Sequence, residues 1–254
     1  MDTIRMVTWL APGLPLVFFE RVREALQAQL QLTVSLQSRT KLSGPDVGSA
    51  DPFANGSAEL GFLCAPAAVP DAVRAQGGFE LLSLAPVFDD ARYAGKPHCY
   101  CDIVVREDTP GTSLADLEGL TFGYNDRSSL SGWLGLSDAL RAKQRTPEDF
   151  FGALVQTGGH LTSLRQLRAQ TIQVASIDSN VLRTHPGALD GLRIIDSVGP
   201  WPSQPVVVRS TLDPDIKARI KAALQTCGPW SEWGFVGFGD QDISQLNQAP
   251  SAVS

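Results

Sequence analysis

The first forty residues alternate between strand-type and helix-type hydrophobic patterns. Residues 4–10 alternate apolar and polar side chains, as a half-buried strand does, and residues 32–36 repeat this period of two. Between them, apolar side chains recur with the spacing of one buried helix face, at Leu16, Phe19, Val22, Leu26 and Leu30. A strand, a helix and a strand with short connections predict a βαβ unit whose two strands lie parallel. The chain is therefore expected to build an α/β fold.

Similar alternation continues through most of the chain. Further strands are predicted at residues 58–64, 81–87, 102–106, 120–122, 153–156, 173–177, 192–195 and 205–208. Further helices are predicted at residues 70–76, 129–141, 161–169 and 213–225. At 254 residues the chain is long enough for two lobes. We expect one lobe from 1–103 with 206–254 and another from 104–205, each a mixed sheet flanked by helices, with a ligand cleft between them.

The charge and hydropathy of the chain exclude two classes of partner. A net charge of −6 argues against a general nucleic-acid or anionic-membrane binder, because that binding depends on many Lys and Arg side chains. No apolar run approaches the roughly 18 residues of a membrane span, so direct membrane insertion is not expected. Residues 1–16 lack the long apolar region of a secretion signal. The protein is expected to be periplasmic if a leader was removed, and cytoplasmic if Met1 is the native start.

The cysteines and glycines predict neither a metal nor a cofactor. Cys64, Cys99, Cys101 and Cys227 form no C-x-x-C pair. In an extended chain, Cys99 and Cys101 share a face that His98 does not, so these three side chains would not converge on a metal ion. The sequence also lacks a P-loop and a G-x-G-x-x-G motif, so no nucleotide cofactor is expected.

Residues 123–132 form the most unusual loop of the chain. They follow the short apolar run at 120–122 and open the predicted helix at 129–141. Backbone N–H groups at a helix start have no partner inside the helix and favour negative charge. Polar side chains crowd this helix start, at Asn125, Asp126, Ser128, Ser129 and Ser131. The cluster predicts an anion cradle, with an ordinary N-cap as the alternative.

Two later loops have the same position after a predicted strand. Gly158 and Gly159 precede His160 at a helix start, where the backbone can approach a ligand closely and the imidazole can donate to an anion. Asp178 follows the strand 173–177 and can either cap the next helix or accept a hydrogen bond from a ligand. Trp9 and Tyr100 lie at or near strands and are candidates for pocket walls, although core packing is the alternative.

The order of these motifs resembles the phosphate, phosphite and phosphonate solute-binding proteins of ABC transporters, which have the type 2 periplasmic-binding-protein fold. The resemblance covers roughly residues 58–243 and depends on Tyr124-Asn125-Asp126, Ser129-Leu130-Ser131-Gly132, Phe150-Phe151, residues 158–163 and residues 175–179. It implies that Ser128, Ser129, Ser131, His160 and Asp178 line an anion pocket. A small oxyanion and an ABC transporter permease would be the partners.

Two functions remain open at this point. The first is a two-lobed binding protein that closes on a phosphonate, phosphite, phosphate or similar oxyanion without catalysis, for transport or sensing. The alternative is a cytoplasmic small-molecule enzyme of the same fold, in which His160 and Asp178 act as acid and base. Serine hydrolysis through Ser131 is disfavoured, because Ser129 stands where a G-x-S-x-G elbow needs glycine. We expect a binding protein, with no catalytic residue.

Overall fold

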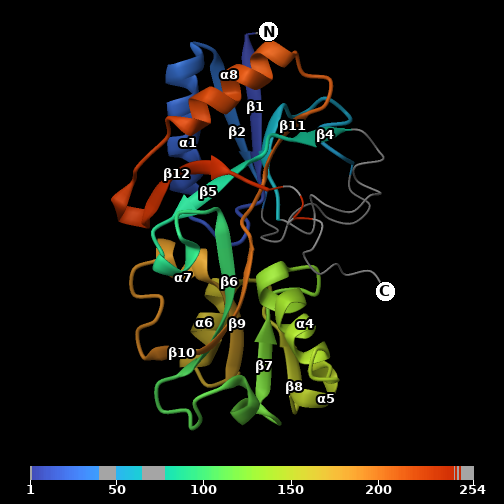
Figure 1. Cartoon of the computed structure of the whole chain (residues 1–254), viewed down its shortest axis with the longest axis vertical. Helices are drawn as coiled ribbons and strands as arrows, with labels where there is room; N and C mark the ends of the chain where they lie inside the picture. The colour runs from blue at the N-terminus through green and yellow to red at the C-terminus, as the bar shows by residue number, and fades with distance from the viewer. Residues whose placement is uncertain (1, 40–49, 65–77, 243, 245, 247–254) are drawn as a thin grey trace. The chain divides into compact units, whose positions relative to one another are not determined.

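The computed structural model describes residues 2–39, 50–64, 78–242, 244 and 246, and the chain divides into two compact units (Figure 1). Unit 1 comprises Met1–His98 and Pro202–Gln248, and unit 2 contains Cys99–Trp201. Each unit is built on a mixed five-stranded sheet with helices. The predicted α/β fold with two lobes is therefore confirmed. The lobe boundaries expected from the sequence, 1–103 with 206–254 and 104–205, and the cleft between the lobes remain predictions.

The sheet of unit 1 has the strand order β2-β1-β3-β11-β4. Its strands are β1 (Thr3–Thr8), β2 (Thr33–Ser38), β3 (Leu60–Phe62), β4 (Phe79–Leu81) and β11 (Val206–Arg209). Strand β1 runs parallel to β2 and β3, whereas β11 runs antiparallel to β3 and β4. The parallel pairing of β1 with β2 confirms the βαβ unit predicted from the first forty residues.

Helices α1 (Leu16–Leu30) and α8 (Pro214–Gln225) contact each other in unit 1. Four of the five predicted inward positions of α1 are buried, but Leu16 is 39% exposed and Phe18 is buried. The prediction for Leu16 is wrong. Phe18 lies one helical turn before Val22 and takes the place on the buried face that was expected for Leu16. Asp213 caps α8 by accepting hydrogen bonds from two backbone N–H groups of its first turn.

A second, two-stranded antiparallel sheet pairs β5 (Leu84–Phe88) with β12 (Phe235–Asp240). The sequence predicts one strand at 81–87, but β4 ends at Leu81 and Ser83 has a φ of 55°, which interrupts the strand. Aromatic side chains of the C-terminal region pack on α1, with the ring of Phe18 centred 5.1 Å from that of Phe235. These aromatic side chains therefore belong to the core of unit 1.

The sheet of unit 2 has the strand order β10-β6-β9-β7-β8. Its strands are β6 (His98–Arg106), β7 (Thr121–Tyr124), β8 (Ala153–Gln156), β9 (Val174–Asp178) and β10 (Leu192–Pro202). Strand β7 runs parallel to β8 and β9, and β6 runs antiparallel to β9. The carboxyl ends of β7, β8 and β9 therefore lie at one edge of the sheet, where the unusual loops follow them.

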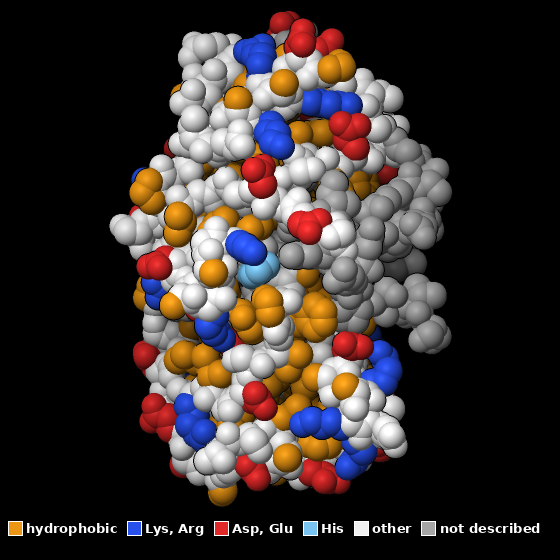
Figure 2. Space-filling view, viewed as in Figure 1, with side chains coloured by type: hydrophobic (Ala, Val, Ile, Leu, Met, Phe, Trp, Pro, Cys, Tyr) orange, Lys and Arg blue, Asp and Glu red, His pale blue; other side chains and the backbone are white. Residues whose placement is uncertain are grey.

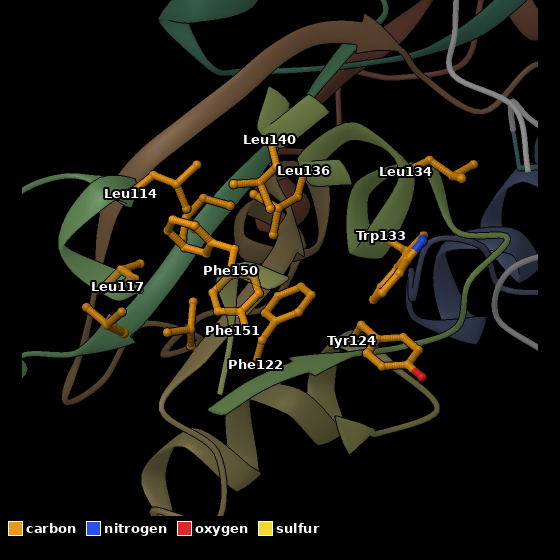
Figure 3. Packing of buried hydrophobic residues seen from close by; sticks show 13 residues of the cluster. Leu114, Leu117, Phe122, Tyr124, Trp133, Leu134, Leu136, Leu140, Phe150 and Phe151 are labelled. Carbon is orange, nitrogen blue, oxygen red and sulfur yellow. The ribbon is translucent and has the colours of Figure 1, made fainter. Parts of the chain in front are cut away.

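Helical segments cover both faces of this sheet. One face packs against η2 (Leu114–Leu117), the π-helix η3 (Leu130–Leu134), α4 (Gly135–Arg141) and α5 (Pro147–Phe150). Figure 3 shows the aromatic part of this layer, with the ring of Phe122 beside that of Phe151 and the indole of Trp133 beside Tyr124. The other face packs against α6 (His160–Arg168) and α7 (Ser179–Thr184).

The remaining described elements are short. They are the 3-10 helices η1 (Ala91–Tyr93) and η4 (Ser231–Trp233). The helix predicted at 70–76 lies outside the described residues. Within the described part of the chain, no helix has the length and apolar character needed to cross a membrane. All four cysteines are buried, and no described group of three or more His, Cys, Asp or Glu side chains is placed to hold a metal ion.

Candidate anion-binding site

Ser129 is the N-cap of η3, at the end of the loop that follows β7. Its hydroxyl oxygen accepts one hydrogen bond from the Gly132 N–H at 3.1 Å and another from Nδ2 of Asn125 at 2.8 Å. A hydroxyl group has two acceptor positions and one proton to donate. Because both acceptor positions are occupied, the proton of Ser129 is left to donate to a further acceptor. The N-cap interpretation is confirmed, and it does not use the donor that an anion would need.

Gly132 allows Asn125 to lie against the start of this helix. A Cβ atom at position 132 would come within 1.7 Å of Oδ1 of Asn125, which is far closer than two such atoms can approach. Both side chains of the pair formed by Asn125 and Ser129 are buried. Only glycine at position 132 leaves room for this arrangement. Oδ1 of Asn125 is buried and has no hydrogen-bond partner among the described residues.

The helix that begins at Ser129 starts as a π-helix. The carbonyl of Ser129 accepts from Leu134 N–H at 2.9 Å, and the carbonyl of Leu130 accepts from Gly135 N–H, five residues later in each case. Ser176 of β9 donates its hydroxyl to the carbonyl of Ser131 at 2.5 Å. A π-helical turn is uncommon and occurs frequently at functional sites. The bond from Ser176 ties this turn to the central strand β9.

His160 is the first residue of α6 and is fully buried. Its Nε2 atom lies 3.2 Å from Oγ of Ser131, which joins the starts of two helices. Burial lowers the pKa of the imidazole to about 4, although the charge of Asp126 and the backbone of Ser176 oppose the shift. The ring is therefore neutral at pH 7. Its Nδ1 atom is buried and reaches no hydrogen-bond partner within the described residues.

Asp178 ends β9 and caps α7 by accepting a hydrogen bond from the Asn180 N–H at 2.9 Å. The capping alternative for this residue is therefore confirmed. Burial raises the pKa of the carboxyl group to about 7, and the charge of Asp102 acts in the same direction. Hydrogen bonds from Asn180, Ser131 and Cys99 oppose that shift. Near neutral pH, Asp178 can thus exist either as a carboxylate or as a protonated acid.

The glycine pair before α6 shapes the loop after β8. Gly158 has a φ of 82°, in the left-handed region that favours glycine. The hydroxyl oxygens of Thr157 and Ser163 lie 2.6 Å apart across this turn, and Thr157 also donates to the Tyr124 carbonyl. These bonds hold the start of α6 beside the end of β7. His160 is positioned by this turn.

Ser128 and Arg127 are engaged within the loop that follows β7. The hydroxyl of Ser128 donates to Oδ1 of Asp126 at 2.5 Å. The guanidinium of Arg127 lies 4.3 Å from the ring centre of Trp133 and forms an exposed ion pair with Glu148 at 2.7 Å. Arg127 is therefore held by its own neighbours rather than beside Ser131 and His160.

The two predicted aromatic walls lie in different units. Tyr100 is on β6 of unit 2, and its backbone N–H donates to the hydroxyl of Ser179, directly after Asp178. Trp9 belongs to unit 1, where it is buried in a cluster with Phe53 and Phe79. Within unit 1, Trp9 therefore packs in the hydrophobic core, as the alternative interpretation expects. The roles of both residues in a ligand pocket remain predictions.

Two surface pockets lie away from these residues. One, of about 270 Å³, is in unit 2 and is lined by Leu114, Ala115, Glu118, Leu140, Lys143, Arg145 and Phe150. The other, of about 470 Å³, lies beside the first turns of α1 in unit 1. Neither lining includes Ser129, Ser131 or His160. We place the candidate site by the convergence of polar side chains, because pocket size alone says nothing about anion binding.

Sequence reasoning gave no role of their own to two residues that organise the site. Ser176 is a polar residue between the apolar residues Ala175 and Ile177 of a buried strand, which is a signal that its hydroxyl has a specific acceptor. Gly132 follows Ser128, Ser129 and Ser131 at a helix start. Because glycine is a poor helix former, its presence there was a signal that another group lies too close for a Cβ atom. Both signals were visible in the sequence, but the partners came from separate elements.

Solved structures of low sequence identity share the fold of this chain. A binding-protein component of an ABC phosphonate transporter from Pseudomonas aeruginosa is 19% identical, with a TM-score of 0.72 and coverage of 96% of this chain and 83% of that chain. PhnD1 from Prochlorococcus marinus in complex with methylphosphonate is 12% identical, with a TM-score of 0.73 and coverages of 97% and 95%. A Xanthomonas citri protein bound to ATP is 18% identical, with a TM-score of 0.67 and coverages of 98% and 96%.

The sequence itself matches a protein family over most of its length. A comparison with curated proteins gives no match. Residues 11–246, however, match the family described as ABC transporter, phosphonate, periplasmic substrate-binding protein. This is a family of transporter binding proteins rather than of enzymes. The chain belongs to the family of phosphonate-type periplasmic substrate-binding proteins of ABC transporters.

Proposed function

We propose that this protein binds a small oxyanion in unit 2, at the point where the starts of η3 and α6 meet the end of β9. The side chains that contact the ligand would be Ser129, Ser131, His160 and Asp178, with Asn125 supporting Ser129. The ligand would be a phosphonate, phosphite, phosphate or similar anion. Its release to the permease of an ABC transporter would complete the function, and the periplasm would be the place of binding.

The observation that carries this proposal is the hydrogen bonding of Ser129. Its oxygen accepts from Asn125 and Gly132, so the hydroxyl proton must find an acceptor elsewhere. A buried donor without an acceptor is costly, at about 1–3 kcal/mol. An oxyanion supplies that acceptor and places its negative charge at a helix start, where the helix dipole favours it.

Neutral donors would hold the anion in this site. His160 is neutral at pH 7, and Arg127 pairs with Glu148. Hydrogen bonds to a charged group contribute about 1.5–3 kcal/mol each, so four of them give roughly 6–12 kcal/mol before ordering costs. Micromolar affinity requires about 8 kcal/mol. The dipoles of two helix starts therefore add a needed contribution of about 0.3–1 kcal/mol each.

The surface charge is compatible with recognition of a small ligand. Figure 2 shows Lys and Arg side chains interspersed with Asp and Glu side chains on the face in view. Because positive and negative side chains are mixed there, that face has no large area of uniform electrostatic potential. Recognition of the anion would therefore depend on short-range hydrogen bonds inside unit 2 rather than on long-range attraction.

A thermal-shift screen tests the proposed ligand class. The probes are methylphosphonate, phosphite, phosphate and methanesulfonate, with acetate as a planar carboxylate for comparison. A ligand present at 100 times its Kd stabilises the native state by about 2.7 kcal/mol, which raises Tm by several degrees. The proposal expects at least one tetrahedral oxyanion to raise Tm in proportion to the logarithm of its concentration. Unchanged Tm with all four tetrahedral probes at millimolar concentration would reject it.

A further inference from the structure

The side-chain amide of Asn125 is held in one orientation by two neighbours. Its Nδ2 group donates to Oγ of Ser129 at 2.8 Å. Its Oδ1 atom lies against the backbone of Gly132, because a Cβ atom at that position would come within 1.7 Å of it. A carbonyl oxygen accepts a weak hydrogen bond from a Cα–H group, whereas an NH2 group in the same place would meet it hydrogen to hydrogen. The amide therefore presents its oxygen, rather than its nitrogen, on this side.

Oδ1 of Asn125 is an acceptor that receives no proton from the protein. The residue is 1% exposed, and Oδ1 has no hydrogen-bond partner within the part of the chain that the structure describes. The backbone carbonyl of Asn125 accepts from the Gly158 N–H at 3.1 Å, two residues before His160. Asn125 thus contacts both the start of η3 and the loop that leads into α6. A buried polar atom without a partner is uncommon in proteins, and a bound ligand with a donor group accounts for this one.

Ser129 and Asn125 require opposite groups of a ligand. The hydroxyl proton of Ser129 needs an oxygen that accepts it, whereas Oδ1 of Asn125 needs a group that donates, because an amide oxygen carries no proton. The two atoms lie close to one point beside Gly132, since its Cβ atom would be 3.1 Å from Oγ of Ser129 and 1.7 Å from Oδ1. Two oxygens of one small tetrahedral anion can therefore reach both atoms, provided that one of the oxygens carries a proton.

His160 does not impose the same requirement. Its Nδ1 atom is also buried and finds no hydrogen-bond partner in the described ranges of the chain. A ring nitrogen of a neutral imidazole can either donate or accept, depending on the tautomer. His160 can therefore contact a ligand oxygen with or without a proton. Among Asn125, Ser129 and His160, only Asn125 presents an atom that must receive a proton.

We infer that Asn125 selects oxyanions that retain a hydroxyl group, by accepting a hydrogen bond from that hydroxyl at Oδ1. This inference rests on the proposed function and narrows its ligand class. A hydrogen phosphonate, hydrogen phosphite or hydrogen phosphate carries an acceptor oxygen for Ser129 and a donor hydroxyl for Asn125. A sulfonate or a fully ionised phosphonate has acceptor oxygens only, so one of its oxygens would face Oδ1 with no proton between them. Such anions are disfavoured by repulsion between the two oxygens.

Several titratable or charged groups belong to the candidate site and its surroundings. They are Tyr124 of β7, Asp126 and Arg127 of the loop after it, Glu148 of α5, His160 of α6 and Asp178 of β9. Burial lowers the pKa of His160 to about 4 and raises that of Asp178 to about 7. Because Asp178 can itself titrate near neutral pH, a pH dependence measured with one ligand would not identify the proton. The test therefore compares ligands that differ in their own ionisation.

Methylphosphonate and methanesulfonate form a matched pair of monoanions. At about pH 5.5, methylphosphonate carries one charge and one P–OH group, and methanesulfonate has the same charge and a similar shape without that proton. Calorimetry should give roughly 10-fold to 150-fold weaker binding for methanesulfonate. Equal affinity of the native protein for the two anions would overturn the inference and leave the binding function standing.

Asn125→Ala removes the acceptor and should abolish this preference. Methylphosphonate should bind more weakly than to the native protein, and the ratio of the two affinities should fall to about one. Ser137→Ala, which removes a buried hydroxyl that donates to the Trp133 carbonyl, is the control and should keep the native ratio. Urea unfolding shows whether both variants remain folded. If Nδ2 rather than Oδ1 faced the ligand, Asn125→Ala would weaken both anions equally, and this unchanged ratio would overturn the inference.

The pH dependence of binding to the native protein identifies the proton without any variant. Chloromethylphosphonate has a lower second pKa than methylphosphonate, because chlorine withdraws electrons. Above the second pKa of each ligand, its affinity should fall about tenfold per pH unit, since only the form with a hydroxyl group binds. The decline should therefore begin at lower pH for chloromethylphosphonate. Methanesulfonate has no proton to lose at these pH values, so its pH dependence reports the protein groups alone.

The outcomes separate this selection from the proposed function. A decline that begins at the same pH for both phosphonates would place the proton on the protein, and would overturn the inference while the binding function stands. Absence of binding by all three anions would reject the proposed function itself, and the selection with it.

Discussion

Oγ of Ser131 lies 3.2 Å from Nε2 of His160, although the two residues are 29 positions apart in the chain. Ser131 is in the first turn after the loop of β7, and His160 begins the helix after β8. Parallel strands β7 and β8 bring these two helix starts to one edge of the sheet. The fold thus assembles a hydroxyl and an imidazole that separate βα units supply.

Ser176→Ala should weaken anion binding, although the substitution removes only one hydroxyl group. The change leaves the buried carbonyl of Ser131 without the hydroxyl donor, which costs about 1–3 kcal/mol, and loosens the π-helical turn. We expect urea unfolding to show this loss of unfolding free energy, and calorimetry to show roughly tenfold weaker anion binding. Ser137→Ala removes a hydroxyl that donates to the Trp133 carbonyl and serves as the control, with native affinity. Native affinity in Ser176→Ala would show that this bond does not position Ser131.

Gly132→Ala should displace the side chain of Asn125. The new Cβ atom would meet Oδ1 of Asn125 at 1.7 Å, so the amide must move and release Ser129. Overpacking of this kind costs about 1–3 kcal/mol in unfolding free energy. In the double variant with Asn125→Ala, the clash is absent, so the two losses should not add. Additive losses in the denaturation cycle would contradict the contact.

Arg127→Ala should leave anion affinity unchanged. The guanidinium lies over Trp133 and pairs with Glu148, and the ion pair is exposed. Exposed pairs and cation–π contacts contribute about 1 kcal/mol or less, so a small loss of stability and a change in Trp133 fluorescence are expected. Tenfold weaker binding in calorimetry would instead place Arg127 in the ligand site.

Asp178→Asn should stabilise the protein increasingly as pH rises. The pKa of Asp178 is raised from 3.8 to about 7, so the native state holds its proton more tightly than the unfolded state. The proton on Asp178 therefore adds to the free energy of unfolding of the native protein. This added stability is fully present below pH 3.8 and is lost as pH rises to about 7. The difference in unfolding free energy between variant and native protein should therefore grow over this range and then level off.

The size of this effect follows from the shift in pKa. A shift of one pKa unit corresponds to about 1.4 kcal/mol, so the rise from 3.8 to about 7 gives a full difference on the order of 4 kcal/mol. Glu107→Gln, which changes an exposed carboxylate outside the candidate site, is the control for the substitution itself. Urea unfolding at several pH values measures both variants. A difference that does not depend on pH would mean that Asp178 keeps its ordinary pKa.

The elements of the fold could be predicted where local pattern and tertiary context agree. The strand expected at 153–156 is β8 with the same bounds, and the helix expected at 161–169 differs from α6 by one residue at each end. A capping box formed by Ser113 and Asp116 begins η2, as the residue types at these two positions favour. In these segments, the hydrophobic period, the caps and the turn residues all favour the same structure.

Other features depend on partners that are distant in sequence. Gly199 and Pro200 indicate a turn, yet they lie within β10, where pairing with β6 prevails. The π-helix after Ser129 depends on a hydroxyl from β9, which no local pattern contains. The candidate residues were recognisable by type and position, but the direction of each hydrogen bond required the structure.

The central claim is that the hydroxyl of Ser129 donates to a bound oxyanion. Calorimetric titration of methylphosphonate into the native protein and into Ser129→Ala tests it most directly, with Ser113→Ala as a control that loses another N-cap serine. Loss of a hydrogen bond to a charged group, about 1.5–3 kcal/mol, predicts roughly 10-fold to 150-fold weaker binding for Ser129→Ala. Ser113→Ala should bind as the native protein does. Equal affinity of all three proteins would contradict the claim.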